Sequence, residues 1–138
     1  MSKKFQTKQK ARIHALQALY SWYISENNLQ DIENHILDDK NLSKIDANYF
    51  KKLLHEVPAN LSTINDLIKP HINIPLNKLD TIELIVLQIA TFELTECKDI
   101  PFKVVINEAL ELNKKFGTVD GYKFVNGVLD KIVKELKE

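Results

Sequence analysis

Apolar residues recur at intervals of three and four along most of this chain, which is the spacing of one face of a helix. The pattern predicts a helix over residues 119–136, whose apolar positions are Val125, Val128, Leu129, Ile132 and Leu136. A helix before it is bounded by Pro101, which suits a first helical position, and by Gly117, which suits the residue just past a helix end, where φ is often positive.

The same spacing predicts further helices in the first half of the chain, over residues 8–27, 31–37, 43–57 and 61–70. Thr7 and Ser43 are candidate N-caps for two of them, and Pro58 predicts a kink or break. Residues 71–79 read as a loop.

A central helix is predicted to begin after residue 80. Asp80 and Glu83 resemble a capping box, with Asp in the place of Ser or Thr. The run from Ile82 to Leu94 is apolar nearly all round, as expected for a helix packed on several sides.

Composition supports one all-helical domain. The chain has 138 residues, of which 44% are hydrophobic, and only 3 glycines and 4 prolines, too few turn residues for a sandwich or barrel. The predicted architecture is all-α with about seven helices, divided into subdomains of about residues 1–72 and 73–138. Its single cysteine, Cys97, excludes an intramolecular disulfide. We also find no membrane span and no secretory signal, so we expect a soluble, cytoplasmic protein.

Charge is distributed unevenly although the net charge is zero. No acidic residue precedes Glu26, whereas five basic residues do, so the remainder carries 14 basic and 19 acidic residues. The basic residues are Lys3, Lys4, Lys8, Lys10 and Arg12. We expect Lys8 to Arg12 to project past the core and to offer their charges to an anion, although a solvated helix end would look the same.

The helix over residues 119–136 carries a polar shoulder beside its apolar stripe, formed by Asp120, Phe124, Gly127 and Lys131. Phe124 falls about 100° from the stripe, at the edge of the core face. Gly127 costs roughly 1 kcal/mol relative to alanine in mid-helix, which suggests that a backbone, a ring or a ligand comes close.

We find no pattern typical of an enzyme. The four histidines are scattered over separate elements, and Asp31 with His35 provides too few ligands for a metal site. The sequence has no Walker-type loop, no GxGxxG, no GxSxG and no HExxH. We therefore expect no catalysis, no metal and no cofactor.

Three segments resemble the NusB family of transcription antitermination factors: VVINEALEL followed by KKFG and KFVNGVLDKI, ARIHALQALYSW near the start, and IELIVLQIATFEL in the middle. The resemblance implies two crossed three-helix subdomains. It also implies an RNA-binding factor that pairs with the small-subunit ribosomal protein NusE on single-stranded boxA elements of nascent ribosomal RNA, and that supports complete transcription of that RNA. Other antitermination factors and RNA polymerase would be indirect partners.

By that resemblance the N-terminal segment, with Lys8, Lys10 and Arg12, binds RNA. The segment departs from the family's arginine-rich pattern, because lysine replaces arginine at two positions and so loses planar, bidentate donors.

The resemblance also carries RNA contacts onto Asp120, Lys123 and Phe124, where the Phe124 ring would stack on a base. Tyr20 and Glu83 match positions that face NusE. The alternative role of Tyr20 is core packing, and that of Glu83 is helix capping.

Two alternatives stay open. A helical protein–protein adaptor would use the Phe124 shoulder and leave the basic N-terminus idle. NusB-like domains also occur fused to ribosomal RNA methyltransferases, but the chain has no glycine-rich cofactor loop, so we expect the binding domain alone. If RNA and NusE bind adjoining sites, they should bind cooperatively.

Overall fold

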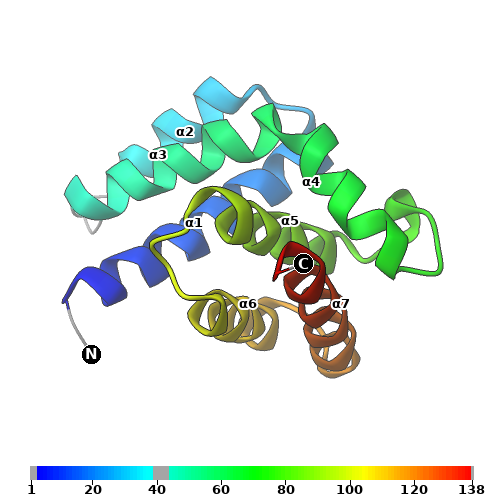
Figure 1. Ribbon diagram of the computed structural model, residues 1–138. Helices are drawn as coiled ribbons and strands as arrows, with labels where there is room; N and C mark the ends of the chain where they lie inside the picture. The colour runs from blue at the N-terminus through cyan, green and yellow to red at the C-terminus, as the bar shows by residue number, and fades with distance from the viewer. Residues whose placement is uncertain (1–2, 39–43, 138) are drawn as a thin grey trace. The chain divides into compact units, whose positions relative to one another are not determined.

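The structure, a computed structural model, describes residues 3–38 and 44–137 (Figure 1). Over these residues it contains seven α-helices, two 3-10 turns and no strand, which confirms the all-α class. The helices are α1 (Lys3–Ser25), α2 (Leu29–Leu37), α3 (Lys44–Ala59), α4 (Leu61–Ile68), α5 (Thr81–Glu96), α6 (Phe102–Phe116) and α7 (Val119–Lys137), with turns η1 (Lys69–His71) and η2 (Leu76–Lys78). Within the described ranges, no helix has the length and apolar character needed to cross a membrane.

The chain forms two compact units, Met1–Ala59 and Asn60–Glu138. In the first unit, α1 lies along α3, and α2 contacts both. Much of the apolar face predicted for α1 and α3 is buried, and its most enclosed side chains are Leu16, Leu19, Phe50, Leu53 and Leu54, whereas Tyr20 is exposed.

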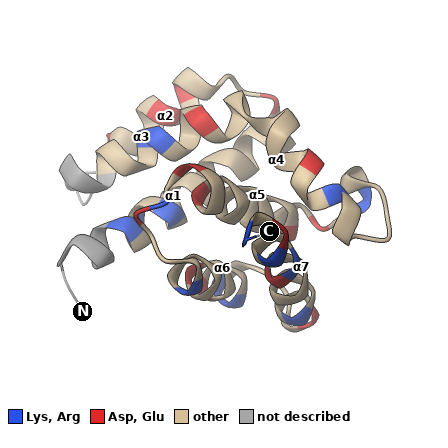
Figure 2. Ribbon diagram, viewed as in Figure 1, with Lys and Arg blue, Asp and Glu red and all other residues tan. Residues whose placement is uncertain are grey.

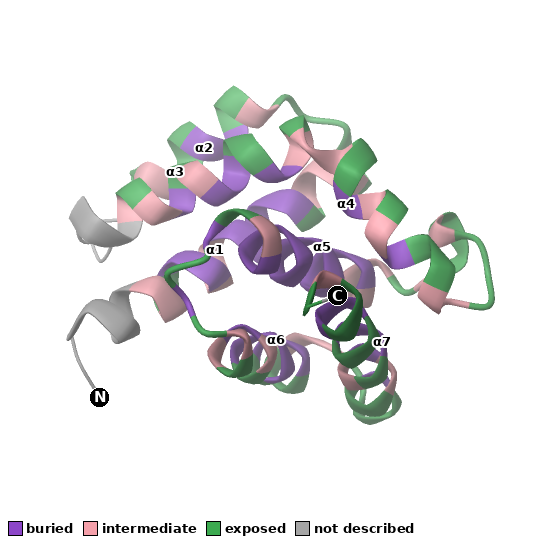
Figure 3. Cartoon of the chain, in the orientation of Figure 1, coloured by how far each residue is buried: buried purple, intermediate pink, exposed green. Residues whose placement is uncertain are grey.

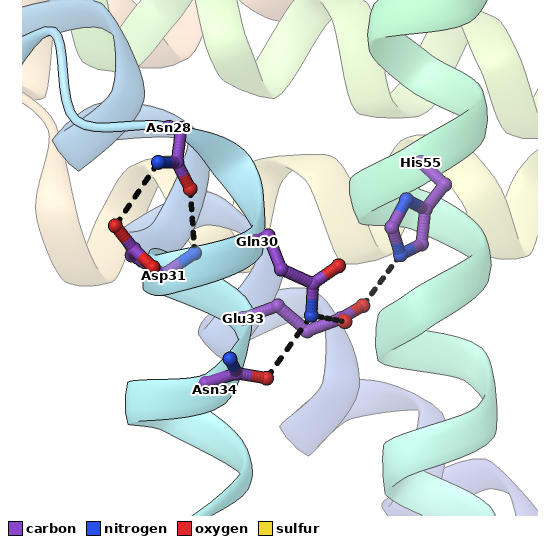
Figure 4. A network of polar contacts seen from close by, with 6 residues as sticks. All are labelled: Asn28, Gln30, Asp31, Glu33, Asn34 and His55. Carbon is purple, nitrogen blue, oxygen red and sulfur yellow. Dashed lines mark hydrogen bonds and ion pairs between the residues drawn. The ribbon is translucent and has the colours of Figure 1, made fainter.

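A network of polar contacts joins α2 to α3 (Figure 4). Asn28 caps α2 by accepting a hydrogen bond from the Asp31 N–H at 2.8 Å. The buried carboxylate of Glu33 pairs with Nε2 of His55 on α3 and also accepts from Gln30. A buried carboxylate needs such partners, so the contact fixes how α2 lies on α3.

The second unit is built around α5, which contacts α4, α6 and α7. Every residue from Leu84 to Leu94 is buried, as the burial colouring of α5 shows (Figure 3). The prediction of a central helix packed on several sides is therefore confirmed. Asp80 caps α5 as expected, because its carboxylate accepts from the Glu83 N–H at 3.1 Å.

Several sequence expectations need correction at the helix ends. Thr7 is not an N-cap, since α1 already begins at Lys3, and Ser43 lies outside the described residues. Gly117 does end α6, but its φ is −101° and not positive. Pro58 lies inside α3, which ends one residue later, as expected from the lost backbone donor.

The division between the units also differs from the expected boundary near residue 72. Helix α4 contacts α5, and Asn65 on α4 accepts a hydrogen bond from Gln88 on α5 at 3.1 Å. Ile64 and Ile68 place the apolar face of α4 in the core. We therefore place α4 in the second unit, with the boundary between Ala59 and Asn60.

Candidate functional site

The basic segment of α1 carries blue positions and no red ones in Figure 2, as its sequence requires. Lys10 is exposed and Lys8 is half-buried, with its Nζ 5.1 Å from the centre of the Tyr49 ring on α3. Arg12 is only 2% exposed, and its guanidinium lies 5.8 Å from the centre of the same ring.

The expectation that this whole segment projects into solvent is therefore wrong for Arg12. Its long stem and planar head pack on an aromatic ring, which suits a guanidinium better than an ammonium group. Ala11 beside it is fully buried, so the core begins earlier along α1 than its few large apolar residues suggested. Of the three basic residues predicted to bind RNA, Lys10 is the exposed one.

The shoulder of α7 has the predicted exposure. Phe124 is half-buried, and Asp120, Lys123 and Lys131 are exposed. Gly127 is also exposed, but a Cβ atom built on it would meet nothing within 4 Å. The suggestion that a neighbouring backbone or ring comes close to Gly127 is therefore wrong for the described part of the chain.

The close approach occurs instead at Gly121, in the first turn of α7. A Cβ atom there would lie 2.8 Å from Oε2 of Glu83, which comes from the start of α5. Burial and the carboxylates of Asp80 and Asp120 raise the pKa of Glu83, while a hydrogen bond from Thr118 acts in the opposite direction. Glu83, which is predicted to contact NusE, and Asp120, which is predicted to contact RNA, are therefore neighbours.

A hollow of about 440 Å³ lies at the turn between α6 and α7. Its lining combines two lysines, Lys114 and Lys123, with the exposed side chains of Val119 and Tyr122. The sequence did not lead us to predict Tyr122 as a lining residue of a site. The signal for it was the run Tyr122, Lys123, Phe124, in which a cation stands between two aromatic residues.

The first unit offers a second hollow of about 440 Å³, between α1 and α2. His14, Asp31 and His35 are among its lining residues. Among the described residues, no three histidine, cysteine, aspartate or glutamate side chains are placed to hold a metal ion.

Tyr20, one of the two predicted partner residues, lies on α1 and is 40% exposed.

The comparisons with known proteins decide the family. The model of the NusB family matches residues 9–134, which is most of the chain. The chain belongs to the NusB family. A curated relative from Shewanella woodyi, the transcription antitermination protein NusB, is 50% identical over 126 residues, which are 91% of this chain and 94% of the relative. The NusB of Pseudoalteromonas translucida is 46% identical over 95% of this chain and 96% of its own length.

Solved structures of NusB proteins share the fold. T. maritima NusB has a TM-score of 0.83 and 36% sequence identity, and the match covers 93% of this chain and 91% of that one. A crystal structure of the antitermination factors NusB and NusE in complex with dsRNA has a TM-score of 0.84 and 28% identity, covering 94% and 98% of the two chains. The predicted family and its role in transcription antitermination are thereby confirmed.

Proposed function

We propose that this NusB-family protein, together with the ribosomal protein NusE, binds boxA-type single-stranded RNA and so supports complete transcription of ribosomal RNA. The observation that carries the proposal is the family match, because residues 9–134 include all the candidate site residues except Lys8. A solved NusB with 28% identity to this chain was crystallised with NusE and dsRNA, which supports NusE and RNA as the two kinds of partner.

The RNA surface of this proposal has two parts. Lys8 and Lys10 supply positive charge on α1, and the first two turns of α7 supply Asp120, Lys123 and Phe124. Phe124 is half-buried, so part of its ring can stack on a base while the rest stays anchored in the core. Arg12, enclosed beside Tyr49, would support the segment from within and contact RNA only at its rim.

The NusE surface would include Tyr20 and Glu83. Tyr20 presents an exposed aromatic side chain, the kind of residue that is enriched in protein interfaces. Glu83 is a half-buried acceptor at the start of α5. The proposed function is binding and includes no catalytic step, no metal and no cofactor, and it would place the protein with nascent RNA in the cytoplasm.

Binding of boxA-type RNA, compared with a scrambled RNA, tests the proposal when it is measured with and without NusE. We expect Phe124→Ala to weaken RNA binding by roughly 1 to 3 kcal/mol, which is the typical contribution of one stacked base, and to leave NusE binding unchanged. Phe102→Ala, which truncates another half-buried ring of the second unit, is the matched control and should bind RNA like the wild type.

An adaptor that binds only protein predicts a different result. It would bind NusE without distinguishing boxA from scrambled RNA, and Phe124→Ala would weaken NusE binding instead. A core role for Phe124 would show as a loss of stability of about 3 to 5 kcal/mol with RNA affinity preserved in the folded fraction.

A further inference from the structure

The hollow at the turn between α6 and α7 adjoins the proposed RNA surface. Its volume is about 440 Å³, and its lining includes Glu111, Lys114, Val119, Tyr122 and Lys123. Tyr122 is 45% exposed and Val119 is 91% exposed, so the fold leaves both of these large hydrophobic side chains facing solvent. The hollow therefore offers an aromatic ring and an aliphatic side chain to a ligand.

Tyr122 and Phe124 lie at the two borders of the exposed face of α7. At about 100° per residue, Lys123 projects midway between them, about 100° from each ring. Lys123 is exposed, whereas Gly121 and Val125, on the opposite side of the helix, are buried. A single RNA strand that leaves the Phe124 ring can therefore reach the Tyr122 ring by crossing α7 over Lys123, a path of only about 10–12 Å.

The charges around the hollow favour phosphate. Lys114 and Lys123 are exposed, and within the described part of the chain neither forms an ion pair. The two ammonium groups outnumber the lining carboxylate of Glu111, and the exposed Lys115 adds a third cation beside the Phe116 ring. Unpaired cations next to an exposed ring supply the two attractions that single-stranded nucleic acid needs, one for its phosphates and one for its bases.

We propose that this hollow is a second base-binding site for the RNA strand that Phe124 contacts: Tyr122 stacks on a base just outside the boxA element, and Lys114 contacts the neighbouring phosphate. The inference rests on the proposed function and lengthens its RNA footprint. The volume of the hollow lies within the range of small-ligand pockets, roughly 300–1,000 Å³, which leaves room for a nucleotide. Because every base has a face that can stack, the flanking nucleotide need not have a fixed identity.

Affinities for RNAs of different length, measured with NusE present, test this site. The probes are a boxA-type RNA, the same RNA extended by three adenosines at its 5′ or its 3′ end, and matching extensions of abasic nucleotides. The abasic extensions keep the phosphates and remove the bases. For the wild type, adenosines at one of the two ends should raise affinity roughly 5- to 150-fold more than abasic nucleotides do, the range for one stacked base.

Tyr122→Ala should remove this gain and leave the affinity for the unextended RNA at the wild-type value. Tyr122→Phe keeps the ring and should keep the gain. Ile74→Ala is the matched control, because it truncates another hydrophobic side chain of the second unit with a similar exposure of 47%. Urea unfolding of each variant checks that the fold is retained.

Lys114→Ala tests the phosphate contact independently of the ring. It should lower the salt dependence of binding by about 0.7 log unit per log unit of salt for the extended RNA, and leave that of the unextended RNA unchanged. Lys134→Ala, which removes an exposed lysine nearer the end of α7, should change neither salt dependence.

The outcomes distinguish this site from the proposed function. A wild type that binds boxA-type RNA with NusE but gains nothing from either extension, or a folded Tyr122→Ala that keeps the gain, overturns the second site and leaves the proposed function intact. A Tyr122→Ala protein that loses affinity for NusE and keeps the RNA gain would make the hollow a protein-binding surface instead. A wild type that does not distinguish boxA-type from scrambled RNA overturns the proposed function and, with it, the second site.

Discussion

The two glycines of α7 show how different the demands on single residues can be within one helix. Gly121 is buried against Glu83, whereas Gly127 is exposed with open space around it. The absence of a side chain at residue 121 is required by packing, and the absence at residue 127 is not. Only an external ligand would give Gly127 a comparable role.

We predict that Gly127→Ala stabilises the protein by roughly 0.5 to 1 kcal/mol, because alanine loses less conformational entropy in mid-helix and meets no neighbour. Urea unfolding measures the change. RNA affinity should also be measured: if the RNA backbone passes over Gly127, the stabilised variant binds more weakly. A destabilised Gly127→Ala would contradict the open surroundings seen here.

At the scale of elements, the basic segment of α1 combines a structural role with a proposed role in binding RNA. Its basic segment packs two cations on the ring of Tyr49, while Lys10 points away from the core. Helix α1 is thus anchored through the same short segment that is proposed to attract RNA. Substitutions there should separate the two roles.

We predict that Arg12→Ala lowers the free energy of unfolding by roughly 1 to 3 kcal/mol, since it removes a buried, ring-stacked guanidinium. Lys10→Ala, the exposed control, should stay within about 0.5 kcal/mol of the wild type. Lys10→Ala should instead reduce the salt dependence of RNA binding by about 0.7 log unit per log unit of salt, the value for one phosphate contact on a single strand.

Equal stability losses in the two variants would show that the ring contact of Arg12 contributes little. An unchanged salt slope in Lys10→Ala would remove Lys10 from the RNA surface.

At the scale of the whole molecule, the ionisation of Glu83 should appear in the pH dependence of unfolding. Burial and the nearby carboxylates of Asp80 and Asp120 raise its pKa in the folded protein above the ordinary value of 4.5. The folded state therefore binds this proton more tightly than the unfolded state. The associated stability is fully present below pH 4.5 and is lost as the pH rises through the raised pKa.

We predict that Glu83→Gln, which cannot ionise, gains stability relative to the wild type as the pH rises from 4.5 through that pKa, and that the difference then levels off. Urea unfolding of both proteins at a series of pH values measures the difference, in which the contributions of titrating groups that do not interact with Glu83 cancel. A difference in stability that is constant with pH would show that the pKa of Glu83 is not raised in the folded protein.

The sequence by itself determined the class of the fold and most of its elements, because helical periodicity, capping at Asp80 and the breaks near Pro58 and Gly117 are local signals. It also determined the family, since the matching segments span the chain. The exposure of the α7 shoulder followed from the same periodicity.

Only the tertiary structure decided which side chains meet. Burial of Arg12 on Tyr49, the crowding of Gly121 by Glu83, and the assignment of α4 to the second unit all depend on residues far apart in the chain. A local pattern reports which face of a helix is apolar, but not which neighbour covers it, because that neighbour is chosen by the packing of the whole unit.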